Sequence, residues 1–212
     1  MSAHHGHDHD HDHSCAAAAS GPIPAGYRRA LWIALAANAA MAVLEITSGL
    51  AAGSVSLLAD AIDFAGDAAN YGLSLAVLSL APVWRSRVAW LKGWAMAAFG
   101  LFVLGRALWT LLSGRVPEPL TMGLVGALAL AVNLGVAWLL YAWREGDANM
   151  RSVWLCTRND AIGNLAVLAA ALGVFGTGQA WPDLVVAVVM AALALSSAVV
   201  VLRHARAELS AR

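Results

Sequence analysis

Four residues that can bind metal ions occur as two pairs with the same spacing, each inside a long apolar segment. Asp63 and Asp67 form one pair, and Cys156 and Asp160 form the other. Residues four apart lie on one face of an α-helix, about 6 Å apart along its axis. Each pair could therefore share one cation. Carboxylates combined with a thiolate suit Zn²⁺ or Cd²⁺ better than Mg²⁺ or Ca²⁺.

The segments that carry these pairs have the composition of membrane helices. Of the 212 residues, 60% are hydrophobic and only 12% are charged, which is more apolar than a soluble domain of this size requires. Six runs reach the roughly 20 apolar residues that a spanning helix needs. They cover about 30–50, 55–80, 88–112, 120–143, 152–175 and 182–203. We predict an all-α integral membrane protein with six transmembrane helices, because nothing here alternates like a barrel strand.

The basic residues predict how the helices are oriented. Eleven of the 13 Lys and Arg residues fall on one side if short loops make neighbouring helices antiparallel. They precede the first helix, lie between the second and third, flank the start of the fifth, and follow the sixth: Arg28, Arg29, Arg85, Arg87, Lys92, Arg144, Arg151, Arg158, Arg203, Arg206 and Arg212. Positive charge accumulates on the cytoplasmic side of membrane proteins. We expect both termini in the cytoplasm and a multi-pass protein of the cell inner membrane.

The same topology brings the two pairs to a similar depth. Asp63 and Asp67 are expected about 12–18 Å below the outer boundary, and Cys156 and Asp160 about 15–21 Å below it. An ionised Asp near the bilayer centre costs at least ~2.5 kcal/mol, which a bound divalent cation would offset. The alternative is that these side chains pair with Arg158 or hydrogen-bond to neighbouring helices.

Two nearby polar residues could be accessory metal ligands. Asp60 extends the face of Asp63 and Asp67, and it could guide ions toward the outer mouth or simply be solvated. Asn164 follows Asp160 by one turn and could add a carbonyl oxygen, although Asn in membrane helices often ties helices together.

The N-terminal segment has a different composition. Residues 1–26 are predicted to be a disordered metal-binding tail, since they are too polar to fold alone or to act as a secretory signal. Six closely spaced imidazoles alternate with aspartates: His4, His5, His7, His9, His11 and His13. Such a segment can bind Zn²⁺, Ni²⁺ or Cu²⁺; a solvated tail and a cloning artefact are the alternatives. The two cysteines, Cys15 and Cys156, predict no disulfide framework.

Residues 27–212 are predicted to form the transport domain, and about residues 27–208 resemble the cation diffusion facilitator family of divalent-metal/proton antiporters. The resemblance is carried by Asn38, Glu45 and Gly49, by the run Gly53 to Asp67 (GSVSLLADAIDFAGD), and by Asn133, Asp160 and Trp181-Pro182-Asp183. It implies six helices with cytoplasmic termini. It also implies metal ligands at Asp63, Asp67, Cys156 and Asp160, where the family commonly places His or Asp, Asp, His and Asp.

Two departures from the family pattern accompany this resemblance. The thiol of Cys156 replaces the usual His and should favour softer ions. The family usually continues into a soluble cytoplasmic metal-binding domain, which we expect this protein to lack. We also expect a homodimer.

The predicted function is therefore efflux of Zn²⁺, with Cd²⁺ as a second substrate, by proton antiport. No enzymatic activity, prosthetic group or nucleic-acid partner is expected. A transporter of Mn²⁺, Co²⁺ or Ni²⁺, or a membrane metal sensor without transport, is the alternative. An intramembrane aspartyl protease also uses two Asp residues that share a proton, but a third Asp and a thiol fit metal binding better.

Overall fold

The protein consists of α-helices and one short 3₁₀ helix, with no strand in the part of the chain that the computed structural model describes, residues 25–76, 82–144 and 148–210. The elements in chain order are α1 (Ala25–Ala52), α2 (Val55–Ala76), α3 (Pro82–Ser113), α4 (Pro119–Leu140), η1 (Tyr141–Trp143), α5 (Ala148–Thr177) and α6 (Trp181–Ser210). The predicted all-α fold with six long helices is confirmed.

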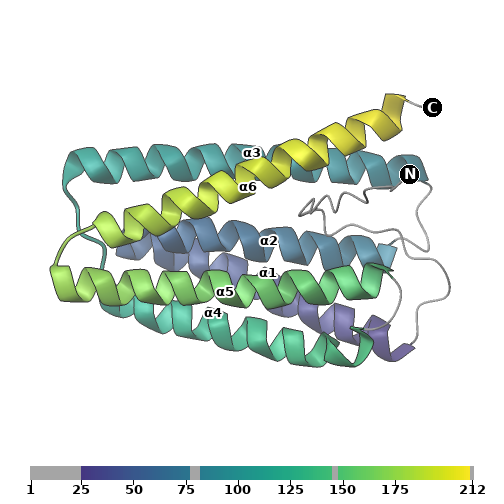
Figure 1. Ribbon diagram of the computed structural model, residues 1–212, viewed down its shortest axis with the longest axis horizontal. Coiled ribbons are helices and arrows are strands. Elements are labelled where there is room, and N and C mark those ends of the chain that lie inside the picture. Colours follow the sequence, from purple (N-terminus) through teal and green to yellow (C-terminus); the bar gives the residue numbers. More distant parts are fainter. Residues whose placement is uncertain (1–24, 77–81, 145–147, 211–212) are drawn as a thin grey trace, which may run out of the picture.

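The helices form two groups (Figure 1). α1, α2, α4 and α5 pack as a four-helix group, in which α1 contacts α2 and α4 contacts α5 most extensively. α3 and α6 form a second pair, and α6 also contacts α2 and α5. α1 begins and α6 ends at the same end of the bundle, which is called the terminal end below, and the opposite end is called the turn end.

Three glycines make the tight connections at the turn end. Gly53, Gly114 and Gly178 have φ angles of 69°, 63° and 64°, a left-handed conformation that a residue with a Cβ adopts only at a cost. The N–H of Gly178 donates to the carbonyl of Val174 at 2.8 Å, as in a left-handed helix cap. These turns join α1 to α2 and α5 to α6 as antiparallel neighbours, and they connect α3 to α4, which belong to different groups.

A buried carboxylate from α6 caps the first turn of α2. The Asp183 side chain accepts hydrogen bonds from the N–H groups of Val55 and Ser56, at 2.8 and 3.0 Å. It also accepts from the hydroxyls of Ser54 and Ser56, at 2.7 and 2.6 Å. An anion at a helix N-terminus satisfies N–H groups that have no partner within the helix. Asp183 therefore fixes the start of α2 against α6.

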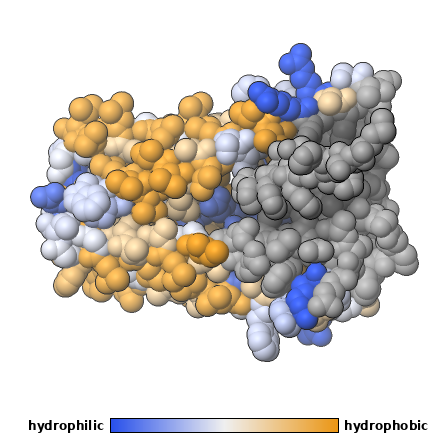
Figure 2. All heavy atoms as spheres, viewed as in Figure 1, coloured by the Kyte–Doolittle hydropathy of each residue, from blue (hydrophilic) through white to orange (hydrophobic). Residues whose placement is uncertain are grey.

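The outer surface of the helices is apolar. Figure 2 shows a broad band of hydrophobic residues with hydrophilic residues at the rim of the left end. Large side chains such as Trp138, Leu172 and Phe175 are mostly exposed. Of the six described helices, five contain a stretch long and apolar enough to cross a membrane, and the exception, α2, carries three aspartates. So much exposed apolar surface requires lipid around it, and the protein is a multi-pass membrane protein.

Four helices, α1, α3, α5 and α6, are longer than the apolar runs predicted. α3 starts at Pro82 rather than near residue 88. Arg85, Arg87 and Lys92, which were expected between two helices, therefore lie on α3 itself. α6 extends to Ser210 instead of about residue 203. The apolar runs marked only the part of each helix that matches the bilayer core, whereas the helical backbone continues into segments whose charged side chains can reach water.

α3 and α6 pack at close range where α3 carries glycine. A Cβ on Gly93 would lie 2.8 Å from Cγ of Leu202, and one on Gly100 would lie 2.9 Å from Cγ of Leu195. Positions seven apart lie on one helix face. Small residues on that face let two membrane helices approach closely, so α6 packs tightly along α3.

Candidate metal-transport site

The aspartates of α2 lie about one turn apart, inside the bundle. Asp60 and Asp67 are buried, with 2% and 7% of their surface exposed, and Asp63 is partly buried. The sequence left open whether Asp60 is solvated, and the structure shows that it is not. Three carboxyl groups on one membrane helix are costly unless something compensates their charge.

Asp160 of α5 meets Asp67 of α2. Their carboxyl groups are close enough to interact directly, and Asp63 lies within electrostatic range of both. Cys156 is also on α5, one turn nearer the terminal end than Asp160, but its side chain lies outside the described part of the structure. The structure thus brings Asp67 and Asp160 together, with Asp63 nearby.

A buried tyrosine holds the Asp67 carboxylate. The Tyr71 hydroxyl donates to Oδ2 of Asp67 at 2.9 Å and lies 2.6 Å from Oγ1 of Thr157. Tyr71 is 1% exposed and Thr157 fully buried. Because Tyr71 is on α2 and Thr157 on α5, this contact connects the same two helices that carry Asp67 and Asp160. It lies on the terminal side of the carboxylate pair.

A lysine from α3 approaches the same carboxylates. The Lys92 ammonium donates a hydrogen bond to Oδ1 of Asn70, which follows Asp67 by three residues on α2. The ammonium also attracts the carboxylates of Asp67 and Asp160. A fixed cation beside these groups offsets part of their charge when no metal ion is bound.

A second acidic contact lies nearer the turn end. Glu45 of α1 is fully buried, and its carboxyl group is close enough to interact with that of Asp60. Neither oxygen of Glu45 has a hydrogen-bond partner among the described residues. The acidic groups therefore extend from Asp160 through the α2 aspartates to Glu45.

Asn164 does not tie helices together within the described part of the chain. Its side chain is fully buried, and neither its oxygen nor its nitrogen finds a hydrogen-bond partner there. Oδ1 of Asn133 on α4 is likewise without a partner among those residues. A buried polar group left without any partner costs about 1–3 kcal/mol.

The described carboxylates interact as neighbours but do not form a compact metal cluster. Among the described residues, no three His, Cys, Asp or Glu side chains gather closely enough to hold a metal ion. The predicted four-ligand set includes Cys156, whose side chain is not among them. The tail through residue 24, with its six histidines, also lies outside the described residues.

The residues that support the aspartates were not predicted from the sequence. Tyr71, Thr157 and Lys92 were not singled out as site residues, and Glu45 was noted only as part of the family resemblance. One signal was available, because Tyr71 follows Asp67 at the same four-residue spacing as the predicted ligand pairs. The contact of Lys92 could not be read from spacing, since it depends on where α3 packs.

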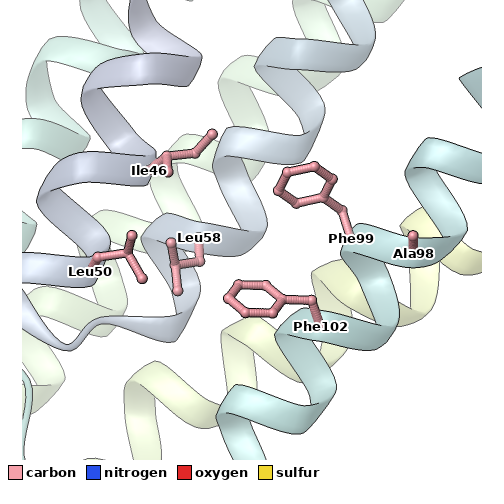
Figure 3. Close-up of a pocket in the computed structure, with 6 residues that line it drawn as sticks. All are labelled: Ile46, Leu50, Leu58, Ala98, Phe99 and Phe102. Atoms are coloured by element: carbon pink, nitrogen blue, oxygen red, sulfur yellow. The ribbon is translucent and has the colours of Figure 1, made fainter.

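The cavity between α1, α2 and α3 differs from this polar group. Figure 3 shows side chains from these three helices around a space of about 360 Å³. It is lined by Ile46, Leu50, Leu58, Ala98, Phe99 and Phe102. These side chains offer no oxygen, nitrogen or sulfur ligand, so the cavity is not where a cation would bind.

The convergence of Asp67 and Asp160 has a clear chemical consequence. Two ionised carboxylates this close repel each other in a medium with little water, so the pair favours binding a proton or a divalent cation. Such a pair can hold a cation in one state and protons in another.

Most of the chain matches a known protein family. Residues 31–210 match the family model of the cation efflux transmembrane domain. The chain belongs to the cation efflux family, the cation diffusion facilitators. The family match covers all six helices, from within α1 to the end of α6.

Several curated members of the cation efflux family are similar in sequence. The metal cation efflux system protein CzcD of Cupriavidus metallidurans is 27% identical over 79% of this chain and 57% of its own length. The zinc transporter ZitB of Escherichia coli is 29% identical over 80% of this chain and 58% of its own length. The cadmium, cobalt and zinc/H⁺-K⁺ antiporter of Bacillus velezensis is 25% identical over 73% of this chain and 54% of its own length. The chain therefore spans a little over half the length of these relatives.

Proposed function

We propose that this cation efflux protein exports Zn²⁺, and Cd²⁺ as a second substrate, from the cytoplasm across the inner membrane in exchange for protons. The observation that carries the proposal is the proximity of the Asp67 and Asp160 carboxyl groups inside a membrane-spanning bundle. The names of the relatives, which include zinc, cadmium and an H⁺-K⁺ antiporter, support the choice of ions.

The proposed ligands are Asp63, Asp67, Cys156 and Asp160. Carboxylate and thiolate ligands bind a cation only when deprotonated, so protons compete with the metal. The ion binds while the site is open to the cytoplasm, and rocking of the helices then exposes it to the other side. Protonation of the ligands on that side releases the metal. The protonated site then returns to the side that faces the cytoplasm. No covalent bond is made or broken, so the protein acts as a transporter and not as an enzyme.

The orientation in this proposal places the terminal end in the cytoplasm. Arg28 and Arg29 at the start of α1, and Arg203 and Arg206 near the end of α6, are exposed at that end, as expected for the cytoplasmic side. The His-rich tail would then collect metal ions near the cytoplasmic entrance. The proposal includes a homodimer, which light scattering of the purified protein in detergent would test.

The decisive experiment is metal uptake into proteoliposomes under a pH gradient. We expect gradient-driven Zn²⁺ and Cd²⁺ flux by the full chain, accompanied by proton movement in the opposite direction. Asp160→Asn, which keeps the shape but removes the charge, should lower flux at least about tenfold. Glu118→Gln is the matched control, because it removes an exposed carboxylate at the turn end and keeps a side-chain oxygen that can cap the N–H groups of Leu120 and Thr121 at the start of α4.

Each alternative gives a different result in the same assay. Wild-type flux that survives in Asp160→Asn would show that the metal crosses elsewhere. Selective flux of Mn²⁺, Co²⁺ or Ni²⁺ would replace zinc as the substrate. Tight metal binding with no flux would identify a membrane sensor. Metal flux without opposite proton movement would remove antiport from the proposal.

A further inference from the structure

The ring of Tyr71 packs among apolar side chains, whereas its hydroxyl makes polar contacts. Its ring belongs to an apolar cluster that includes Leu31 of α1 and Val136 and Leu140 of α4. Its hydroxyl reaches out of this cluster to Asp67. A side chain locked by packing on its apolar body places its polar tip accurately, so the position of the hydroxyl is set by three helices.

The direction of the hydrogen bonds follows from the proton count. A phenol has one proton, and Tyr71 donates it to Oδ2 of Asp67. With that proton in use, the Thr157 hydroxyl, 2.6 Å away, can donate to the tyrosine oxygen. The order is Thr157 to Tyr71 to Asp67, and bonds in such a chain strengthen one another.

This chain of hydrogen bonds acts on one specific oxygen of a proposed ligand. It uses one lone pair of Oδ2, which favours coordination of a cation through Oδ1 alone. Zn²⁺ takes four ligands at about 2.0–2.2 Å, which suits single-oxygen coordination. Larger divalent ions take more oxygen ligands at longer distances, often both oxygens of a carboxylate. The hydrogen bond therefore favours the smaller ion.

We propose that Tyr71, supported by Thr157, is a positioning residue that presents the Asp67 carboxylate to the transported ion and favours Zn²⁺ over Cd²⁺. The inference rests on the proposed function, because it assumes that Asp67 is a ligand. It concerns a residue that touches Asp67 and not the metal. It also explains why a phenol hydroxyl lies fully inside a membrane bundle, where a phenylalanine would pack without needing a partner.

The test compares two tyrosines of the same cluster in the full chain. Tyr71→Phe removes the hydroxyl that contacts Asp67, whereas Tyr27→Phe removes a hydroxyl from a buried tyrosine whose ring packs against Trp143. Flux is measured in proteoliposomes over a range of Zn²⁺ and Cd²⁺ concentrations. We expect Tyr71→Phe to raise the half-saturating Zn²⁺ concentration about tenfold, as loss of a ligand's supporting hydrogen bond usually does. The half-saturating Cd²⁺ concentration should change much less.

Thr157 provides a second, conservative comparison. Thr157→Val removes the hydroxyl that donates to Tyr71, and it should shift the Zn²⁺ preference in the same direction by a smaller factor. Thr157→Ser keeps the donor and should lie closer to the wild type than Thr157→Val does. A purely structural role of this contact would lower the maximum rates for both ions together and leave the ratio of half-saturating concentrations unchanged.

Two outcomes separate this inference from the proposed function. Equal shifts for Zn²⁺ and Cd²⁺ in Tyr71→Phe, or no difference from Tyr27→Phe, overturn the inference while transport stands. If the wild type shows no flux, transport fails, and Zn²⁺ binding is measured by calorimetry instead. For this, all six tail histidines are changed to Ala in both the wild-type and the Tyr71→Phe chain. Weaker Zn²⁺ binding by Tyr71→Phe then supports the positioning role, and equal binding overturns it.

Discussion

The four-helix group buries many polar side chains, whereas the α3–α6 pair buries few and packs through apolar and small residues. Within the described residues, the buried polar side chains of the four helices are Asn38, Glu45, Ser56, Asp60, Asp67, Ser74, Asn133, Thr157 and Asn164. The corresponding residues of α3 and α6 are Thr110 and Asp183. Polar atoms without partners also concentrate in the four-helix group, as at Glu45 and Asn164.

This difference separates two roles within one bundle. Buried polar groups without partners lower stability, and residues of this kind in membrane helices usually mark a path for ions or substrates. The close contact of Gly93 and Gly100 with α6, by contrast, contributes packing but offers no ligand. We infer that the α3–α6 pair mainly supports the four-helix group, which carries the buried carboxylates, and that Lys92 of α3 is the residue of the pair that approaches them.

The largest predicted effect is at Asp183 of α6, whose buried carboxylate reaches the start of α2. Asp183→Ala leaves the N–H groups of Val55 and Ser56 and two serine hydroxyls without their acceptor. We expect a loss of about 3–5 kcal/mol of stability, typical of breaking a buried charged contact. The thermal unfolding midpoint in detergent measures it.

Asp183→Asn is the control for this prediction, because it keeps the shape and one acceptor oxygen. It should fall between the wild type and Asp183→Ala. If Asp183→Ala unfolds at the wild-type temperature, the contact between α6 and the start of α2 does not hold the two helix groups together.

The number of helices and the similar depth of Asp67 and Asp160 in the membrane can be predicted from the sequence for simple physical reasons. A bilayer core requires about 20 apolar residues per helix, so the six apolar runs are visible without an alignment. The four-residue spacing and antiparallel topology place Asp67 and Asp160 at one depth, and in the structure their carboxyl groups interact.

The contacts around these aspartates were not predictable in the same way. Which face of α3 turns toward α2 depends on side-chain packing, so the bond from Lys92 to Asn70 leaves no trace in residue spacing. Burial of Glu45 against Asp60 likewise depends on how α1 is rotated. The helix ends were missed because hydropathy reports the membrane core and not the helical backbone that continues beyond it.

A second, smaller effect is predicted for the close packing of α3 on α6. Gly100→Ala puts a methyl group 2.9 Å from Cγ of Leu195, so the helices must separate or the leucine must move. Overpacking of this kind costs about 1–3 kcal/mol, again read from the unfolding midpoint. Gly105→Ala is the matched control on the same helix, because a Cβ there meets nothing within 4 Å. Equal midpoints for the two variants would show that α3 and α6 are not held by close packing.

The smallest effect on stability is predicted for Asn164→Leu. This variant also gives the sharpest test of the different roles of the four-helix group and the α3–α6 pair. The substitution replaces a fully buried carboxamide, without a partner among the described residues, by an apolar side chain of similar size. Removing such an unsatisfied group should raise stability by about 1 kcal/mol. If the polar interior serves ion transport, the same change should lower Zn²⁺ flux in proteoliposomes, because Asn164 lies one turn from Asp160.

Thr110→Val is the control for this trade-off, because Thr110 is a buried polar residue of the α3–α6 pair. It should leave Zn²⁺ flux unchanged, whatever it does to the unfolding midpoint. A more stable Asn164→Leu protein with wild-type flux would contradict the division of roles, because a polar interior that can be removed without loss of transport is not kept for transport. A gain in stability with a loss of flux is the pattern expected where function and stability compete for the same residue.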